Sequence, residues 1–367
     1  MDDLEVRFGI EERLVQNATW KHIPIYGILE LTPLCNFNCD MCFVRLSTDE
    51  QKKAGELLPV EKWMSLADEM AAKGTLFVLL TGGEPLLYPG FRTLYEHLRK
   101  LGMIITVNTN GSLIDEQWAD FFARNKPRRI NITLYGKDAD TYASLCHNPE
   151  GYDKTIRGIR LLKDRGIDVK VNGSITPANI QDAVRITEIA EELAVPWKLD
   201  TYMYPGSRER SRDFNSQARL TPEQAAGCRV RLMQRQHPDF RQFAEDFFRK
   251  ATEDSPEHDG AVPCRAGRSS FAVNWTGKLR PCVMVTTPEF DVTETRFSDG
   301  WDSLVAKTAE IKLSSRCNGC KRRNVCQTCA ACALLETGHY DGTPDYMCAY
   351  TEHTVRLMEE ILHGKEI

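Results

Sequence analysis

Short apolar runs alternate with longer amphipathic stretches between residues 25 and 205. Six runs rich in β-branched and aliphatic residues predict strands over residues 25–31, 77–81, 104–108, 129–134, 168–174 and 197–203. Between them, apolar residues at helical spacing predict helices over residues 60–73, 90–101, 115–124, 151–165 and 178–193. This βα repeat, at about 30 residues per unit, favours parallel strands with right-handed crossovers. Six units are fewer than the eight of a complete barrel, so we expect an α/β fold with a partial (β/α)6 TIM-like barrel.

The repeat stops after residue 205, and the composition divides the chain into further parts. Residues 1–24 form an N-terminal extension before the barrel of residues 25–205. Residues 206–260 predict a polar, arginine-rich linker and then a helix that begins at Thr221 and Pro222 and runs toward Arg249. Residues 261–350 are rich in cysteine and glycine, which indicates a small metal-stabilised C-terminal domain. Residues 351–367 predict a C-terminal helix.

Composition and charge narrow the classes of function. The 367 residues, 42% of them hydrophobic, allow a sizeable core, while the net charge of -5 gives no support for nucleic-acid binding. The chain has neither a secretory pattern at its N-terminus nor a stretch of about 18 apolar residues, so we expect a cytoplasmic protein without a membrane span. In a reducing compartment, the 13 cysteines indicate metal sites rather than disulfides.

Three cysteines follow the first predicted strand in a Cys35-x3-Cys39-x2-Cys42 loop. Three thiolates from one short loop leave one iron of a [4Fe–4S] cluster without a protein ligand. That iron can be chelated by the amine and carboxylate of an amino acid, which S-adenosylmethionine (SAM) carries. The alternative is a zinc site, but zinc requires a fourth nitrogen or sulfur ligand, and none occurs within the loop.

A glycine-rich motif, Gly82-Gly83-Glu84-Pro85, ends the second predicted strand. Taken alone it indicates a turn, although glycines let backbone carbonyls approach a ligand and Glu84 can accept from an ammonium group. Together with the cysteine loop, the motif resembles the radical SAM superfamily, and the resemblance covers residues 25–205. It implies that Gly82, Gly83, Glu84 and Pro85 hold the amino group of SAM.

The resemblance also suggests further SAM contacts at strand ends. It places Met41 near the adenine, Thr133 near the carboxylate or ribose, and Asn172 or Ser174 near the ribose hydroxyls. Asn110, at the end of the third predicted strand, is another candidate. Each of the polar residues could instead be a local turn or cap, and Met41 could belong to the core.

The C-terminal cysteines resemble the SPASM extension of radical SAM enzymes, which carries two auxiliary [4Fe–4S] clusters. The pattern comprises Cys264, Gly277, Cys282, Cys317-x2-Cys320-x5-Cys326-x2-Cys329-x2-Cys332 and Cys348. The resemblance assigns an outer cluster to Cys317, Cys320, Cys326 and Cys348, and an inner cluster to Cys264, Cys282 and a later cysteine. The family spacing puts that later ligand at Ala330, which Cys329 and Cys332 flank, so its identity stays open. A zinc ribbon is the alternative.

Two further cysteines and the residues after the last predicted strand carry less specific patterns. Cys146 and Cys228 lie in helical patterns and are expected to be ordinary buried thiols. A second set follows the last strand and could line a substrate channel or simply pack: Tyr202, Met203, Tyr204 and Arg208.

The resemblance implies an oxidoreductase that splits SAM reductively, with an electron from a flavodoxin- or ferredoxin-type donor, into methionine and a 5′-deoxyadenosyl radical. Auxiliary clusters would then accept an electron from the substrate radical. The leading hypothesis is a maturase that crosslinks a ribosomally made peptide, aided by a separate leader-peptide recognition protein or by none. Alternatives are a maturase of the anaerobic sulfatase type, a small-metabolite oxidase in cofactor biosynthesis, and a non-catalytic iron–sulfur electron carrier. An electron carrier has no use for the motif at residues 82–85.

Overall fold

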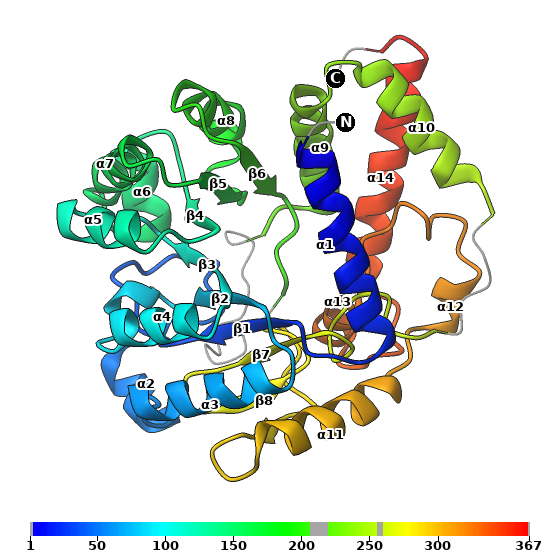
Figure 1. Ribbon diagram of the computed structural model, residues 1–367. Coiled ribbons are helices and arrows are strands. Elements are labelled where there is room, and N and C mark those ends of the chain that lie inside the picture. Colours follow the sequence, from blue (N-terminus) through cyan, green and yellow to red (C-terminus); the bar gives the residue numbers. More distant parts are fainter. Residues whose placement is uncertain (1–2, 206–218, 255–259, 366–367) are drawn as a thin grey trace.

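The computed structural model describes residues 3–205, 219–254 and 260–365, and it confirms the six predicted strands of the barrel (Figure 1). They are β1 (Tyr26–Glu30), β2 (Phe77–Thr81), β3 (Ile104–Thr109), β4 (Arg129–Thr133), β5 (Val169–Ser174) and β6 (Trp197–Asp200). β6 ends three residues earlier than predicted, because Asp200 pairs with Ser174, the last residue of β5, and no partner strand continues beyond it. The predicted linker residues 206–218, with Arg208, lie outside the described ranges.

The strands form one sheet in the order β6-β5-β4-β3-β2-β1, and all adjacent pairs among them are parallel. The register aligns Leu29 with Leu80, Leu80 with Val107, and Val107 with Ile130, and all four side chains are buried. The sequential order places each crossover beside the previous one, so the six carboxyl ends lie along one edge. β6 is one free edge of this sheet, and the barrel is partial as predicted.

The five predicted helices cover the sheet: α3 (Val60–Ala72), α4 (Phe91–Lys100), α5 (Glu116–Arg124), α7 (Gly151–Asp164) and α8 (Ala183–Glu192). Three further helices were not predicted: α1 (Asp3–Trp20), α2 (Thr48–Ala54) and α6 (Ala139–Cys146). α1 packs Val15 and Ala18 against Ile25 and Phe77 beside the amino ends of the strands. None of the helices in the described ranges has both the length and the apolar character needed to cross a bilayer.

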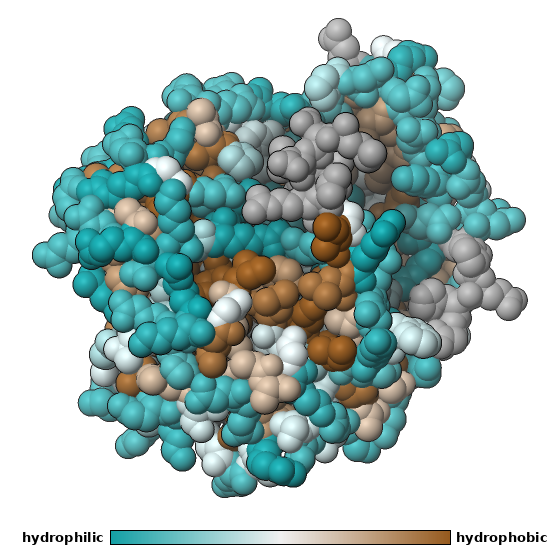
Figure 2. All heavy atoms as spheres, in the orientation of Figure 1, coloured by the Kyte–Doolittle hydropathy of each residue, from teal (hydrophilic) through white to brown (hydrophobic). Residues whose placement is uncertain are grey.

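The face of the molecule that carries α1 is hydrophilic at its rim and hydrophobic near its centre (Figure 2). On α1 itself, Ile10 and Leu14 lie four residues apart and are both exposed. Residues at this spacing share one side of a helix. α1 therefore leaves part of its apolar surface uncovered.

The C-terminal part adds helices and three strands. The strands β7 (Ser270–Val273), β8 (Lys278–Arg280) and β9 (Phe290–Asp291) continue the barrel sheet, because β7 pairs with β1 in parallel. The helices are α9 (Pro222–Gln236), α10 (Phe240–Thr252), α11 (Phe297–Ala309), α12 (Ser315–Asn318), α13 (Ala330–Thr337) and α14 (Asp345–Leu362). The single helix expected from Thr221 toward Arg249 is thus wrong: it is interrupted at His237, whose backbone is extended before Pro238.

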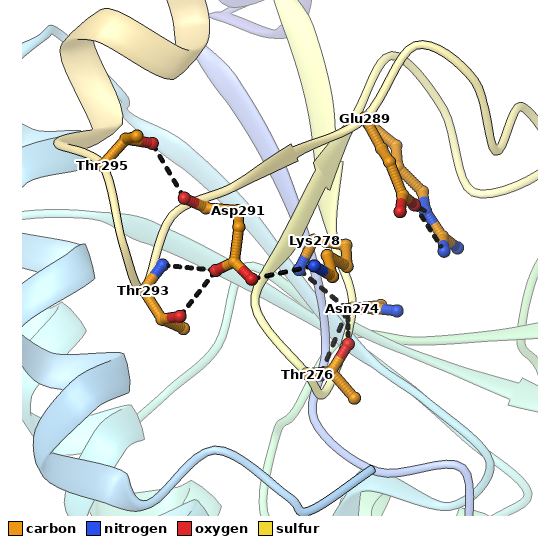
Figure 3. A network of polar contacts seen from close by, with 8 residues as sticks. Asn274, Thr276, Lys278, Glu289, Asp291, Thr293 and Thr295 are labelled. Atoms are coloured by element: carbon orange, nitrogen blue, oxygen red, sulfur yellow. Dashed lines mark hydrogen bonds and ion pairs between the residues drawn. The ribbon is translucent and has the colours of Figure 1, made fainter. Parts of the chain in front are cut away.

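A network of polar contacts fixes the hairpin between β7 and β8 (Figure 3). Asn274 Oδ1 accepts hydrogen bonds from the Thr276 and Lys278 backbone N–H groups, at 3.1 and 2.9 Å, and the Lys278 Nζ atom lies 2.8 Å from Asp291 Oδ2. At the tip of this hairpin, Trp275 is buried against Val44 and Leu46. The C-terminal strands therefore brace the segment that follows the first cysteine loop.

Candidate active site

A cavity of about 800 Å³ lies at the carboxyl ends of the barrel strands. Ten of the predicted site residues line it: Cys35, Cys39, Met41, Cys42, Gly82, Gly83, Asn110, Thr133, Asn172 and Ser174. They come from the loop after β1 and from the ends of β2, β3, β4 and β5. Residues far apart in the sequence are thus gathered at the edge where partial barrels of this kind place their working loops.

The first cysteine loop presents its sulfur atoms with backbone donors already in place. The Phe37 N–H donates to Cys35 Sγ at 3.4 Å, and the Arg45 N–H donates to Cys42 Sγ at 3.3 Å. Burial raises the pKa of Cys35, and the charges of Glu84, Cys39 and Cys42 raise it further. Three thiols this close repel one another as thiolates, so a bound cation or cationic cluster is needed to hold all three deprotonated.

Gly82 and Gly83 touch the cysteine loop backbone to backbone. A Cβ atom on Gly82 would lie 2.4 Å from the Thr32 carbonyl oxygen, and one on Gly83 would lie 2.4 Å from that of Leu34. Gly82 also has a φ of 151°, a conformation that side chains disfavour. Hydrogen bonds join the same segments: the Gly83 N–H donates to the Thr32 carbonyl at 2.6 Å. Only glycine permits this approach.

Glu84 and Pro85 lie behind the cavity wall and are both buried, Glu84 with 0% exposure. The Glu84 carboxylate accepts from the Thr109 hydroxyl at 2.8 and 2.9 Å, from the Asn110 N–H at 2.9 Å and from the Leu86 N–H at 3.1 Å. Burial raises the pKa of Glu84 to about 7, although these hydrogen bonds oppose the rise. Its contacts in this structure anchor the loop after β3, so the predicted contact between Glu84 and an ammonium group stays a prediction.

Through that loop, Glu84 is connected to the first cysteine. The Asn110 side chain donates to Asn36 Oδ1 at 2.9 Å and lies 3.7 Å from Cys35 Sγ. Among the other lining residues, the Asn172 Oδ1 atom is buried and, in the described part of the chain, has no hydrogen-bond partner. Leaving a buried acceptor unpaired costs free energy, so the cavity residue Asn172 favours a ligand that brings a donor such as a hydroxyl group.

The comparison with known families agrees with this geometry. Residues 29–190 match the model of the radical SAM superfamily. This part of the chain is a radical SAM domain. Among curated proteins, the chain is similar to the AdoMet-dependent heme synthase of Methanosarcina barkeri, with 25% identity over 88% of this chain and 95% of that protein. It is also similar to the PqqA peptide cyclase of Granulibacter bethesdensis, with 25% identity over 93% and 91%.

A solved structure shares the fold over nearly the whole chain. Streptococcus suis SuiB bound to S-adenosylmethionine has a TM-score of 0.68 and 17% identity, covering 95% of this chain and 83% of that one. SuiB bound to the precursor peptide SuiA aligns with a TM-score of 0.65, covering 92% and 79%. At this level of identity the likeness establishes the fold alone.

The residues of the radical SAM domain fit its cofactors, which are SAM and a [4Fe–4S] cluster. Three thiols with backbone donors to two of their sulfurs, a close-packed glycine pair, and Asn172 with its unpaired buried oxygen belong to residues that line one cavity. In the described ranges, no three His, Cys, Asp or Glu side chains close around a single metal ion. A four-iron cluster is a larger body than one ion, so its thiolate ligands need not close around a single point.

The four cysteines of the expected outer cluster lie together in the C-terminal part. Burial raises the pKa of Cys348 to about 11, and the charges of Cys326, Cys317 and Cys320 add to the rise, so the four sulfurs are electrostatic neighbours. α12 carries Cys317 and α14 carries Cys348, whose side chain is exposed. The four sulfurs are thus near enough for their charges to act on one another, and their sharing of one cluster stays a prediction.

The cysteines of the expected inner cluster form a second group. Burial raises the pKa of Cys282 to about 11, and Cys264 and Cys329 contribute to that rise. Cys329 precedes α13, and its sulfur accepts from the Cys332 N–H at 3.4 Å. Cys332 itself is buried and contacts the Tyr202 hydroxyl at 3.2 Å. Of the two candidates for the third inner ligand, Cys329 lies with Cys264 and Cys282.

We expect the outer group to hold iron independently of the barrel. Replacing Cys317 and Cys320 together by alanine should lower the iron content by about four atoms per chain, because two of four thiolate ligands are lost. The release of 5′-deoxyadenosine from SAM should persist, since the three barrel cysteines are unchanged. Iron analysis of the anaerobically reconstituted variant checks this, with Cys228→Ala as the control. Full iron content in the double variant would contradict it.

Sequence reasoning missed several residues of the cavity. Tyr135 lines it two residues after the end of β4, and its place near a strand end could have identified it. Lys198, Asp200 and Arg229 also line it, and nothing in the sequence marks Arg229, which comes from α9. Tyr202, Met203 and Tyr204, for which channel lining and packing were both open, line the cavity and also pack against the core.

Proposed function

We propose that this radical SAM enzyme oxidises a side chain of a ribosomally made peptide and installs a crosslink, with one electron leaving through the C-terminal cysteine groups. One observation supports this most directly: the segment after β6 joins the SAM cavity to the inner cysteine group. Tyr204 and Tyr202 both line the cavity, and their hydroxyls lie 3.7 Å from Cys329 Sγ and 3.2 Å from Cys332 Sγ.

Other contacts hold these tyrosines in place. The two rings pack with their centroids 5.0 Å apart, and the Tyr202 hydroxyl donates to Glu336 Oε1 at 2.8 Å. Glu336 is ion-paired with Arg219, and both side chains are largely buried. The Arg219 guanidinium also lies 3.4 Å from the Tyr346 ring centroid. A buried ion pair with stacked aromatic partners fixes a segment in one position, which electron exit over a defined path requires.

When bound, SAM and the reduced cluster supply a radical that removes one hydrogen atom from the substrate. The chain holds the substrate side chain at the cavity wall and excludes water through Met203, Met233 and Phe43, which also line the cavity. The substrate radical would then lose a second hydrogen as a proton, and its electron would pass to a group held by the C-terminal cysteines. The external donor supplies the electron that SAM cleavage consumes.

Relatives named for peptide chemistry support this assignment. The PqqA peptide cyclase is named for a peptide substrate, and SuiB has been crystallised with the precursor peptide SuiA. We extend that substrate class to this chain, together with a flavodoxin- or ferredoxin-type donor and, where a leader peptide is present, a separate recognition protein.

A second candidate is the oxidation of a precursor of heme. It is favoured by the similarity to a heme synthase that covers most of both chains, and by two cationic side chains that line the cavity, Lys198 and Arg229. Such cations would bind the carboxylates that heme precursors carry. Against it, Lys198 Nζ lies 3.4 Å from Asp200 Oδ1, which offsets one of the two charges.

One reconstituted sample distinguishes the two substrates. The holoenzyme is incubated anaerobically with SAM, a strong reductant and either a peptide encoded beside its gene or an iron porphyrin that carries propionates. Peptide maturation predicts that the peptide loses the mass of two hydrogen atoms per crosslink, matched by one 5′-deoxyadenosine. Loss of carbon dioxide from the porphyrin would instead establish the second candidate. Release of 5′-deoxyadenosine without change in either would contradict both.

A further inference from the structure

Cys146, expected to be an ordinary buried thiol, lies beside the second cysteine of the SAM cluster loop. It ends α6, and its side chain has 0% exposure. Backbone hydrogen bonds tie both flanks of Cys39 to this helix end: Asn38 N–H donates to the Cys146 carbonyl at 3.0 Å, and Asp40 N–H donates to the Leu145 carbonyl at 3.1 Å. A hydrogen bond with the Cys146 side chain, together with burial, raises the pKa of the Cys39 thiol well above its usual range, so the two sulfurs are neighbours.

Tyr135 contacts the same sulfur from another side. Its hydroxyl is hydrogen-bonded to Cys39, and its ring packs edge-on against Phe37 and Tyr142, with centroids 6.2 and 5.9 Å apart. Its backbone is held as well, because the Tyr135 N–H donates to the Tyr142 hydroxyl at 3.3 Å and its carbonyl accepts from Asn179 Nδ2 at 2.8 Å. The Tyr135 hydroxyl therefore has little freedom to leave Cys39.

The three cluster cysteines differ in the source of their donors. The sulfur of Cys35 accepts from a backbone N–H and from the Asn110 side chain, and the sulfur of Cys42 accepts from a backbone N–H. Cys39 instead has two side chains beside it, those of Cys146 and Tyr135. An iron-bound thiolate has no proton, so it can only accept, and a neighbouring thiol or hydroxyl must then be the donor. Cys39 is 6% exposed, which leaves water little access to compete.

We propose that the Cys146 thiol and the Tyr135 hydroxyl donate hydrogen bonds to the cluster-bound sulfur of Cys39 and thereby raise the reduction potential of the catalytic cluster. The reduced cluster carries one more negative charge than the oxidised one, so donors to its sulfurs stabilise the reduced form more. Both are positioning residues that act through Cys39. The inference rests on the catalytic cluster of the radical SAM domain and is independent of the peptide substrate.

Substitutions can distinguish the loss of a hydrogen-bond donor from the loss of side-chain packing. Cys146→Ala and Tyr135→Phe each remove a hydrogen-bond donor, whereas Cys146→Ser keeps a donor in a side chain of nearly equal size. The control, Cys228→Ala, removes a buried thiol from a different helix, α9. The readout is the midpoint potential in an anaerobic redox titration followed by electron paramagnetic resonance. The signal of the catalytic cluster is identified by its absence from a variant that lacks Cys35, Cys39 and Cys42.

We expect a more negative midpoint potential in Cys146→Ala and in Tyr135→Phe, an unchanged or higher potential in Cys146→Ser, and the wild-type value in Cys228→Ala. Equal potentials in wild type, Cys146→Ala and Tyr135→Phe would overturn the proposal. If Cys146→Ala binds no cluster, Tyr135→Phe decides, because it keeps the ring that packs against Phe37 and Tyr142. None of these measurements uses a substrate, so a failed peptide assay leaves them intact.

Discussion

Replacing Cys35, Cys39 and Cys42 together by alanine is expected to reduce the release of 5′-deoxyadenosine from SAM to background. All three sulfurs line the cavity at the carboxyl ends of the strands, and no other cysteine among the described residues lines it. Without these thiolates the cluster has no protein ligand, and the electron for SAM cleavage has no route into the cavity. The assay is chromatography of the products after anaerobic reconstitution with a strong reductant.

The same variant should keep the iron of its C-terminal groups. Those cysteines lie on the segments that flank β7 and β8 and on segments around α12, α13 and α14, and the triple substitution leaves them untouched. The control is Cys228→Ala, which should cleave SAM at the wild-type rate. Continued release of 5′-deoxyadenosine by the triple variant would show that the first loop is not the catalytic site.

The barrel could be predicted because its signals are local. Each strand is a short buried run and each helix repeats its apolar positions along one side, so the period of the sequence determines the element. β7, β8 and β9 were missed because they are two to four residues long, and β7 joins the barrel only through pairing with β1, far away in the sequence. α6 was missed because it is only eight residues long and lies between β4 and the predicted helix α7.

The candidate site likewise has features that could be predicted from the sequence and features that only the structure shows. The cysteine loop and the glycine motif are contiguous, so spacing was enough to propose them. The contact between Cys39 and Cys146 joins residues more than a hundred positions apart, and a single cysteine in a helical pattern carries no sign of it. Glu84 is the converse case: its residue type suggested a ligand contact, whereas its burial and its internal donors could only be seen in the structure.

Gly83→Ala is expected to lower the rate of SAM cleavage about a hundredfold, the effect of a displacement of about 1 Å at a reacting site. Gly83 has an ordinary backbone conformation, so alanine introduces no φ strain there. The added Cβ atom would instead lie 2.4 Å from the Leu34 oxygen and 2.7 Å from the Pro33 oxygen. Both are backbone atoms, and Leu34 directly precedes Cys35, so the cluster loop must move.

Gly227→Ala is the matched control. Gly227 lies inside α9, and a Cβ atom there meets nothing within 4 Å. Alanine at this position should leave SAM cleavage unchanged and stabilise the protein by up to about 1 kcal/mol, because glycine is a poor helix former. The iron content and the KM for SAM of Gly83→Ala are measured together, because they distinguish a distorted SAM site from a lost cluster. A raised KM at full iron content would mean that the glycine pair shapes the SAM site, whereas lost iron would mean that it holds Cys35 in place. Wild-type values for both would contradict the close contact between the motif and the cysteine loop.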